Sequence, residues 1–373
     1  MPDSFQYQTY GAKVAAEGVR DLLDHVFNDM KVGQSPGMRP TPVCIWGLHG
    51  IGKTELVREM AQERGFGFSY IAPAQFEEMG DLLGMPMIDQ TEDDQTTVTR
   101  FAPPDWAPRS EGPGILLIDD VNRADDRILR GIMQLLQFYE LVSWQLPEQW
   151  LIVLTANPDG GDYSVTPLDE AMLNRMLHVT MKFDVKAWAK WAEKHRIDAR
   201  GINFVLAYPE LVNGHRTTPR SLVQFFNSIA SIDDLEANLG LVKVLGEACL
   251  DETTTQAFVN FIHLKLDHLP SPEMILDAED FDKIKNRLER LVNDGATKRL
   301  DILSVLISRI NNYVQLHPPG PAQLKNLQAF ILLDLLPNDL RLAMAQELTA
   351  SGTESMQQLY AMPEISRILL EKM

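Results

Sequence analysis

The stretch GLHGIGKT at residues 47–54 constrains the fold of this chain more than any other segment. It follows an apolar run, VCIW, and precedes a segment with the pattern of a helix, ELVREMAQERG. Gly47, Gly50 and Gly52 allow the backbone to curl, so that successive N–H groups point inward and form an anion-binding nest. This order of strand, glycine-rich loop and helix predicts a phosphate-binding loop rather than a glycine-rich turn without function.

Two polar side chains at the end of this loop fit the same chemistry. Lys53 can reach the terminal phosphates of a nucleotide, and Thr54 can ligate Mg²⁺. The first turn of the following helix adds a partial positive charge beside the phosphates. Leu48 and His49 occupy positions that the pattern leaves free. The residues that we expect to contact the nucleotide are Gly47, Leu48, His49, Gly50, Ile51, Gly52, Lys53, Thr54 and Glu55.

After the first 40 residues, short apolar runs alternate with helical segments as far as residue 183. The expected strands are 43–46, 66–71, 115–118, 150–155 and 177–183. Short, continuously apolar strands separated by helices predict an α/β fold, in which helices cover both faces of a parallel sheet. Beyond residue 183 the strand pattern stops, and the remaining segments predict helices.

This pattern predicts four parts. They are an N-terminal helical extension (1–40) with an amphipathic helix over 11–31, an α/β nucleotide-binding core (41–182), a helical lid (183–238), and a C-terminal helical domain of unknown role (239–373). Residues 84–114 contain several prolines and an acidic cluster, which predicts a long, mobile loop or an insertion.

Composition limits the class of function. The chain has 373 residues and a formal net charge of −18, which disfavours broad nonspecific DNA binding but leaves room for a local basic patch. Cys44 and Cys249 lie far apart without the spacing of metal ligands, so we expect two buried thiols in a reducing compartment. Because we see neither a signal-peptide pattern nor an apolar run of membrane-spanning length, we expect a cytoplasmic protein.

A pair of carboxylates follows the apolar run ILLI at 115–118. Asp119 and Asp120 would lie at the carboxyl end of a buried strand, which is the edge where open α/β sheets bind ligands. Asp119 would then hold the Mg²⁺ shell, and Asp120 would position or activate the attacking water. The alternative, taken for this segment alone, is a strand that ends in a solvated acidic turn.

Three motifs in this order, GLHGIGKT, LLIDDVNRA and TANP, resemble the Walker A, Walker B and sensor 1 motifs of AAA+ ATPases. The chain is most similar to the MoxR-like group, including the dynein-related ATPases, over residues 40–230. One departure is that the family usually has Asp-Glu where this chain has Asp119-Asp120. The shorter carboxylate lies about one C–C bond further from the water, which leaves slow hydrolysis open even with intact binding.

The resemblance implies roles for further residues. Asn157 would be sensor 1, which orients the water and senses the γ-phosphate, although an asparagine that starts a turn before Pro158 is the alternative. Arg175 would be the arginine finger, directed at the γ-phosphate of a neighbouring subunit. We expect it late in a helix that begins with Thr166 as N-cap, where the helix dipole alone would also favour a cation.

Arg220 would be sensor 2, acting within its own subunit. Thr218 as N-cap and Pro219 at the first position place it in the first helical turn, where a cation opposes the helix dipole. A nucleotide phosphate would compensate this cost, although a solvated arginine could tolerate it. The resemblance further places Arg123 at a subunit boundary and a hairpin, in the segment YELVSWQLPEQW, before sensor 1.

The resemblance implies an ATPase that binds ATP and Mg²⁺ between core and lid, assembles into a ring, expected to be a hexamer, and remodels a protein client. A partner with a von Willebrand factor A domain is expected from resemblance alone. A DNA-associated loader or motor is a second hypothesis, which the acidity disfavours. A switch that binds ATP and barely hydrolyses it is a third, motivated by Asp120.

Overall fold

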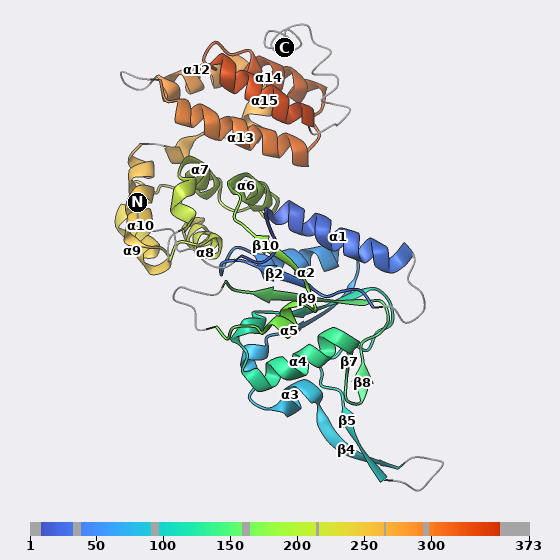
Figure 1. Ribbon diagram of the computed structural model, residues 1–373. Helices are drawn as coiled ribbons and strands as arrows, with labels where there is room; N and C mark the ends of the chain where they lie inside the picture. Colours follow the sequence, from blue (N-terminus) through green and yellow to red (C-terminus); the bar gives the residue numbers. More distant parts are fainter. Residues whose placement is uncertain are drawn as a thin grey trace. The chain divides into compact units, whose positions relative to one another are not determined.

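The chain divides into two compact units. The computed structural model describes residues 9–32, 39–90, 97–158, 165–213, 216–264, 266–293 and 298–350. The first unit lies within residues 1–183 and the second within 184–373. The boundary between the units therefore falls where the strand pattern of the sequence stops (Figure 1).

The first unit is built on a six-stranded parallel sheet in the order β1-β10-β2-β9-β6-β3 (Figure 1). Its strands are β1 (Ala12–Val14), β2 (Val43–Trp46), β3 (Gly67–Ile71), β6 (Gly114–Ile118), β9 (Trp150–Ala156) and β10 (Leu177–Met181). All five strands that the apolar runs predict are present, and the prediction of an α/β fold with a parallel sheet is confirmed.

Helices cover both faces of this sheet. Alternate residues of β6 enter opposite cores: Ile115 and Leu117 face one cluster, whereas Leu116 and Ile118 face the other. The first cluster is closed by α1 (Ala16–Val32) and α2 (Lys53–Glu63). The second contains residues of α3 (Met79–Leu83), α4 (Asp126–Phe138) and α5 (Glu170–Leu173). Short 3-10 turns, η1 (Pro73–Gln75) and η2 (Val121–Arg123), complete the connections.

The N-terminal segment differs from the prediction. A single helix over 11–31 is wrong for its first residues, because Ala12–Val14 form strand β1 and pair with Val179–Met181 of β10. The strand extends the edge of the main sheet, and α1 packs on one face of that sheet. Strand β1 and helix α1 therefore belong to the first unit rather than to a separate helical extension.

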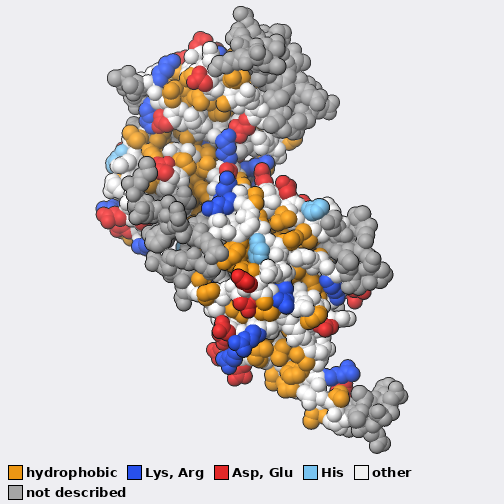
Figure 2. Space-filling view, viewed as in Figure 1, with side chains coloured by type: hydrophobic (Ala, Val, Ile, Leu, Met, Phe, Trp, Pro, Cys, Tyr) orange, Lys and Arg blue, Asp and Glu red, His pale blue; other side chains and the backbone are white. Residues whose placement is uncertain are grey.

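The segment predicted as a long, mobile loop or an insertion contains an antiparallel ribbon. Strands β4 (Met85–Gln90) and β5 (Thr97–Ala102) pair antiparallel and stand apart from the main sheet, so the loop prediction is wrong for them (Figure 1). Met85, Met87 and Ile88 are exposed on β4, and apolar side chains gather on this part of the first unit (Figure 2). A second, smaller hairpin joins β7 (Glu140–Leu141) to β8 (Trp144–Gln145), where the sequence led us to expect one.

Every secondary-structure element among the described residues of the second unit is an α-helix or a 3-10 turn. Its helices are α6 (Val185–Lys194), α7 (Ala199–Ala207), α8 (Pro219–Ile229), α9 (Leu239–Cys249), α10 (Glu252–His263), α11 (Pro272–Leu276), α12 (Phe281–Val292), α13 (Leu300–Leu316), α14 (Pro321–Ile331) and α15 (Asn338–Ala350), with 3-10 turns η3 (Pro209–Asn213) and η4 (Leu266–His268). A division of this unit into lid and C-terminal domain at residue 238 stays a prediction. None of the helices in the described ranges has the length and apolar character needed to cross a bilayer.

A buried ion pair joins α6 to α13 within this unit. Arg309, only 4% exposed, directs its Nε at Glu193 Oε1 at 3.3 Å and donates from a terminal nitrogen to Asn203 Oδ1 at 3.1 Å. Burial raises the pKa of Glu193 to about 7, although the nearby Arg309 opposes the shift. Burial also lowers the pKa of Arg309. Desolvation therefore outweighs the attraction between the two groups, and each charge depends on the presence of the other.

The two cysteines are free thiols in different environments. Cys44 is fully buried in strand β2, and burial raises the pKa of its thiol, as expected for an inert structural residue. Cys249, at the end of α9, is only half-buried. The expectation of buried thiols is confirmed for Cys44 and is wrong for Cys249.

Candidate nucleotide-binding site

The glycine-rich loop runs from the end of β2 to the start of α2. Gly47, Gly50 and Gly52 have φ values of 155°, 72° and 96°, in the region that favours glycine. A Cβ on Gly47 would lie 2.7 Å from the Met181 carbonyl oxygen and 2.7 Å from the Ile51 side chain. At Gly47, glycine is therefore required both by the backbone conformation and by the lack of space for a side chain. The positive φ angles of the three glycines give the loop the curled shape predicted for a phosphate cradle.

Lys53, the first residue of α2, lies inside this loop and is 6% exposed. Its ammonium donates to the carbonyl oxygens of Gly47 at 2.8 Å and Leu48 at 3.2 Å. It also donates to Asn157 Oδ1 at 3.1 Å. These contacts place a buried positive charge at the centre of the loop and connect it with the residue predicted as sensor 1.

Asp119 lies at the carboxyl end of β6, beside the loop. Its Oδ1 accepts from Thr54 Oγ1 at 2.7 Å and from Thr155 Oγ1 at 2.6 Å, and its Oδ2 accepts from Tyr70 OH at 3.1 Å. Burial and the Asp119 charge both raise the pKa of Tyr70, so this phenol stays a hydrogen-bond donor. The structure thus brings together Thr54 and Asp119, the two residues predicted to ligate Mg²⁺.

The Thr54 and Asp119 oxygens fit a magnesium ion. Mg²⁺ prefers oxygen donors and is usually bound through one or two carboxylates together with phosphate oxygens and waters. A hydroxyl and a carboxylate 2.7 Å apart supply such a partial shell. The described residues contain no group of three or more His, Cys, Asp or Glu side chains that could hold a metal by themselves. The remaining ligands of a magnesium ion bound here would be waters and the phosphate oxygens of a nucleotide.

Asp120 and Asn157 form the second half of the site. Asp120 Oδ1 accepts from Asn157 Nδ2 at 2.9 Å, so the predicted water-positioning carboxylate and the predicted sensor are in direct contact. Asn157 is fully buried at the end of β9, and its amide oxygen faces Lys53. One asparagine side chain therefore bridges the lysine of the loop and the second carboxylate, which matches the dual donor and acceptor character of an amide.

Asn122 holds this bridge in place, a role that the sequence did not indicate. Its Nδ2 donates to the Asn157 carbonyl oxygen at 2.8 Å, and its Oδ1 accepts from the Asn157 N–H at 3.1 Å. Thr155, which links Asp119 to the Asp120 N–H, was also missed. A lone threonine near the end of the apolar run LIVLTA is the one signal that could have pointed to it.

Among the described residues, the hydrogen bonds of Arg175 go to Gln137 and Ala171 and not to the residues of the loop, Asp119, Asp120 or Asn157. The predicted helix start is wrong: Asp169, not Thr166, caps α5, and the helix ends at Leu173 before Arg175. The Arg175 guanidinium donates to Gln137 Oε1 at 2.9 and 3.1 Å and to the Ala171 carbonyl oxygen. Its role as a finger toward another subunit stays a prediction.

Arg220 belongs to the second unit. Thr218 caps α8 by accepting from the Ser221 N–H, and Pro219 occupies the first helical position, as predicted. Arg220 is exposed in the first turn of this helix. The local structure that motivated the sensor 2 assignment is therefore present, and the assignment itself stays a prediction.

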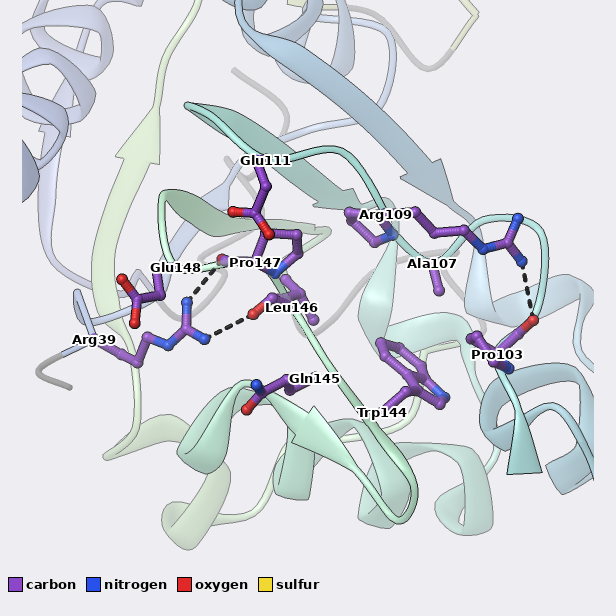
Figure 3. A pocket seen from close by; sticks show the side chains of 11 residues that line it. Arg39, Pro103, Ala107, Arg109, Glu111, Trp144, Gln145, Leu146, Pro147 and Glu148 are labelled. Atoms are coloured by element: carbon purple, nitrogen blue, oxygen red, sulfur yellow. Dashed lines mark hydrogen bonds between the residues drawn. The ribbon is translucent and has the colours of Figure 1, made fainter. Parts of the chain in front are cut away.

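A separate cavity of about 450 Å³ lies at the amino ends of the strands, opposite the phosphate loop (Figure 3). Its lining comes from segments that precede β2, β6 and β9, including Arg39, Ala107 and Trp144. Arg39 donates to the carbonyl oxygens of Leu146 and Pro147, both at 2.7 Å. Because the phosphate loop follows the carboxyl end of β2, this cavity is not part of the nucleotide site.

Comparison with known proteins agrees with this geometry. Residues 42–176 match the family described as AAA domain (dynein-related subfamily). An ATP-dependent protease ATP-binding subunit-like protein of Rhodococcus erythropolis is 28% identical over 144 residues, which are 34% of this chain and 38% of that protein. The chain thus matches less than half the length of this relative.

Solved structures with a similar course of the chain include RuvB and Hsp104. A mutant of RuvB from Thermotoga maritima aligns with 15% identity and a TM-score of 0.40, over 81% of this chain and 89% of that chain. Hsp104 with ATPγS and casein aligns with 16% identity and a TM-score of 0.40, over 62% of this chain and 46% of that chain. The family match and the motifs within it agree, and residues 42–176 of this chain form an AAA domain of the dynein-related subfamily of AAA+ ATPases.

Proposed function

We propose that this protein binds ATP and hydrolyses it to ADP and phosphate. The observation that carries the proposal is the convergence of Lys53, the Thr54–Asp119 pair and the Asp120–Asn157 pair at one edge of the sheet. A phosphate nest, a magnesium-type oxygen pair and a carboxylate–amide pair are the parts that phosphoryl transfer to water requires. The family match of the same segment supports the proposal.

Each residue of the site has a role in this reaction. The N–H groups of the loop, the first turn of α2 and the Lys53 ammonium bind and neutralise the β- and γ-phosphates. Thr54 and Asp119 would hold Mg²⁺, which supplies charge neutralisation on the phosphate oxygens when bound. Asp120 and Asn157 orient the attacking water, and Asp120 is the base that can accept its proton. Catalysis by this set is mainly positioning and electrostatic stabilisation.

We further propose that hydrolysis is completed between subunits. Arg175 would act on the nucleotide of a neighbouring subunit, and Arg220 on that of its own, so that the chain works as a ring, expected to be a hexamer. The half-buried Arg175 is already fixed by Gln137 and Ala171, which supports a preset guanidinium. The ring would remodel a protein client in the manner of MoxR-like ATPases, in the cytoplasm, with a von Willebrand factor A domain protein as the expected partner.

Two alternatives would use the same nucleotide-binding loop. A DNA-associated motor or loader would use the same nucleotide site, but the net charge of −18 disfavours it. A slow, ATP-dependent conformational switch is favoured by the short carboxylate of Asp120, both of whose oxygens already face other groups.

The test is the rate of Mg-ATP hydrolysis per subunit as a function of protein concentration. Lys53→Ala should weaken ATP binding about tenfold or more, and Asp120→Ala should lower kcat about a hundredfold or more. Arg175→Ala should remove about three orders of magnitude of the rate that rises with concentration, whereas the exposed control Arg130→Ala should not. A rate independent of concentration and of Arg175 would contradict completion between subunits. A wild-type kcat equal to that of Asp120→Ala, with ATP bound, would favour the switch.

A further inference from the structure

The segment that leads into α8 is fixed by residues far along the chain, at the junction between α9 and α10. Thr217 is fully buried, and its hydroxyl donates to Asp251 Oδ2 and lies 2.9 Å from the Thr254 hydroxyl. The neighbouring Arg216 donates to two carbonyl oxygens in the last turn of α9, both at 3.4 Å. The start of α8 is therefore bound to this junction by both of the residues that precede its N-cap.

One carboxylate serves the starts of two helices. Asp251 is the N-cap of α10, where its Oδ1 accepts from the Thr254 N–H at 2.7 Å, and its Oδ2 accepts from Thr217 just before α8. Burial alone would raise the pKa of Asp251, but the hydrogen bonds from Thr217 and Thr254 outweigh burial, and the pKa lies below its ordinary value. The carboxylate therefore stays charged while it holds both helices.

The first turn of α8 needs an anchor because it carries Arg220. The first N–H groups of a helix have no partner within the helix, and a cation in the first turn opposes the helix dipole. Thr218 accepts from the Ser221 N–H at 3.2 Å, and Ser221 Oγ accepts from the Thr218 N–H at 2.9 Å. This cap joins only residues of the turn itself. The hydrogen bond from Thr217 to Asp251 is the contact that ties the turn to another helix.

Two contacts with α10 fix the direction of α8. The rings of Phe225 and Phe258, both buried, meet edge to face with their centroids 4.9 Å apart, and Phe225 lies in the second half of α8. The hydrogen bond from Thr217 to Asp251 lies at the other end of the helix. A helix that is held at two points on one neighbour cannot turn about either of them. The side chain of Arg220 therefore extends from a fixed place in the second unit.

We propose that Asp251 positions Arg220 for nucleotide binding: it holds Thr217, and through Thr217 the first turn of α8, from which Arg220 extends. The inference rests on the proposed function, which assigns Arg220 to the nucleotide of its own subunit. Asp251 is a positioning residue, because it acts through Thr217 and α8. Since Asp251 lies beyond residue 238, the segment predicted as a C-terminal domain of unknown role supplies part of the support of the nucleotide site.

The test measures the affinity of the full chain for Mg-ATP by titration calorimetry. Arg220→Ala should weaken binding about tenfold or more, as expected for the loss of a hydrogen bond between charged groups. Thr217→Val removes the hydroxyl and should weaken binding about three- to tenfold, whereas Thr217→Ser keeps a hydroxyl and should bind as the wild type does. The matched control is Thr255→Val, which removes another buried hydroxyl of α10, bonded at 2.9 Å to the Asp251 carbonyl oxygen rather than to its carboxylate. Its affinity should stay within about twofold of wild type.

A second variant acts on the carboxylate itself. Asp251→Ser keeps a favourable N-cap for α10 but leaves no carboxylate oxygen for Thr217, so it should weaken binding as Thr217→Val does, even if that variant folds poorly. When Arg220→Ala is already present, Thr217→Val should weaken binding no further, because its effect runs through Arg220, whereas a merely structural effect would add.

The outcomes separate the positioning role from the proposed function. Wild-type affinity in folded Asp251→Ser, or an additive loss in the double variant, contradicts the positioning role alone. Wild-type affinity in Arg220→Ala contradicts both this role and the assignment of Arg220 to the nucleotide. Failure of the wild-type protein to bind ATP contradicts the proposed function as well.

Discussion

Removing the Asn122 side chain should loosen the predicted sensor, Asn157, and destabilise the first unit. Both side chains are fully buried, and Asn122 is bonded to the N–H and the carbonyl oxygen of Asn157 at 3.1 and 2.8 Å. Asn122→Ala leaves these two backbone groups without their partners, at about 1–3 kcal/mol each. The expected loss in the free energy of unfolding is therefore about 2–6 kcal/mol.

The loss is measured by urea unfolding of the full chain, followed by tryptophan fluorescence, and kcat is measured where the variant remains folded. Asn122→Asp is the sharper variant, because it keeps the acceptor for the Asn157 N–H but turns a carboxylate oxygen toward the Asn157 carbonyl. Its loss should be at least as large. The exposed Asn174→Ala is the control and should stay within about 0.5 kcal/mol of wild type. An Asn122→Ala protein within about 1 kcal/mol of wild type and with normal kcat would show that Asn122 does not hold Asn157 in place.

Three further predictions concern packing and buried charge. Gly114→Ala should lower the free energy of unfolding by about 1–3 kcal/mol, because the new Cβ would lie 2.4 Å from the Trp150 ring. Gly240→Ala in α9 is the control: its Cβ meets nothing within 4 Å, so the substitution should be neutral or slightly stabilising. Thermal unfolding measures both variants. Arg309→Met should cost about 3–5 kcal/mol in urea unfolding, because Glu193 loses its buried cation, and adding Glu193→Gln should recover much of the loss. Since burial raises the pKa of Glu193 from 4.5 to about 7, the folded chain holds a proton that the unfolded chain releases between these values. The stability that Glu193 contributes is therefore full below pH 4.5 and falls as the pH rises to about 7. Glu193→Gln should flatten the dependence of the free energy of unfolding on pH between these values. An unchanged slope in this variant would contradict the raised pKa of Glu193.

The sequence predicts the elements that local pattern determines. The buried strands are apolar runs, and the glycines of the loop at 47–54 adopt the positive φ angles that its curled backbone needs. Both features can therefore be predicted from the local sequence. The contact between Thr54 and Asp119 was also predictable, because both follow strands of one parallel sheet at the same edge.

What the sequence did not predict depends on partners far along the chain. Strand β1 has three residues and is stabilised by pairing with β10. Strand β4 contains Pro86, which disfavours a strand, and is stabilised by its antiparallel pairing with β5. Thr166 has the sequence pattern of an N-cap, yet its hydroxyl donates to the Ala124 carbonyl oxygen, and the cap is Asp169. Asn122 acts through Asn157, and no spacing rule connects the two.

The affinity of the full chain for ATP decides whether residues 47–54 and Asp119 form a site for Mg-ATP. Titration calorimetry with and without Mg²⁺ should show binding by the wild-type protein that Mg²⁺ strengthens. Thr54→Ala should lose the part that depends on Mg²⁺, and Lys53→Ala should weaken binding about tenfold or more in both conditions. Absence of ATP binding by the wild type, or equal binding by Lys53→Ala, would show that residues 47–54 do not form a nucleotide site.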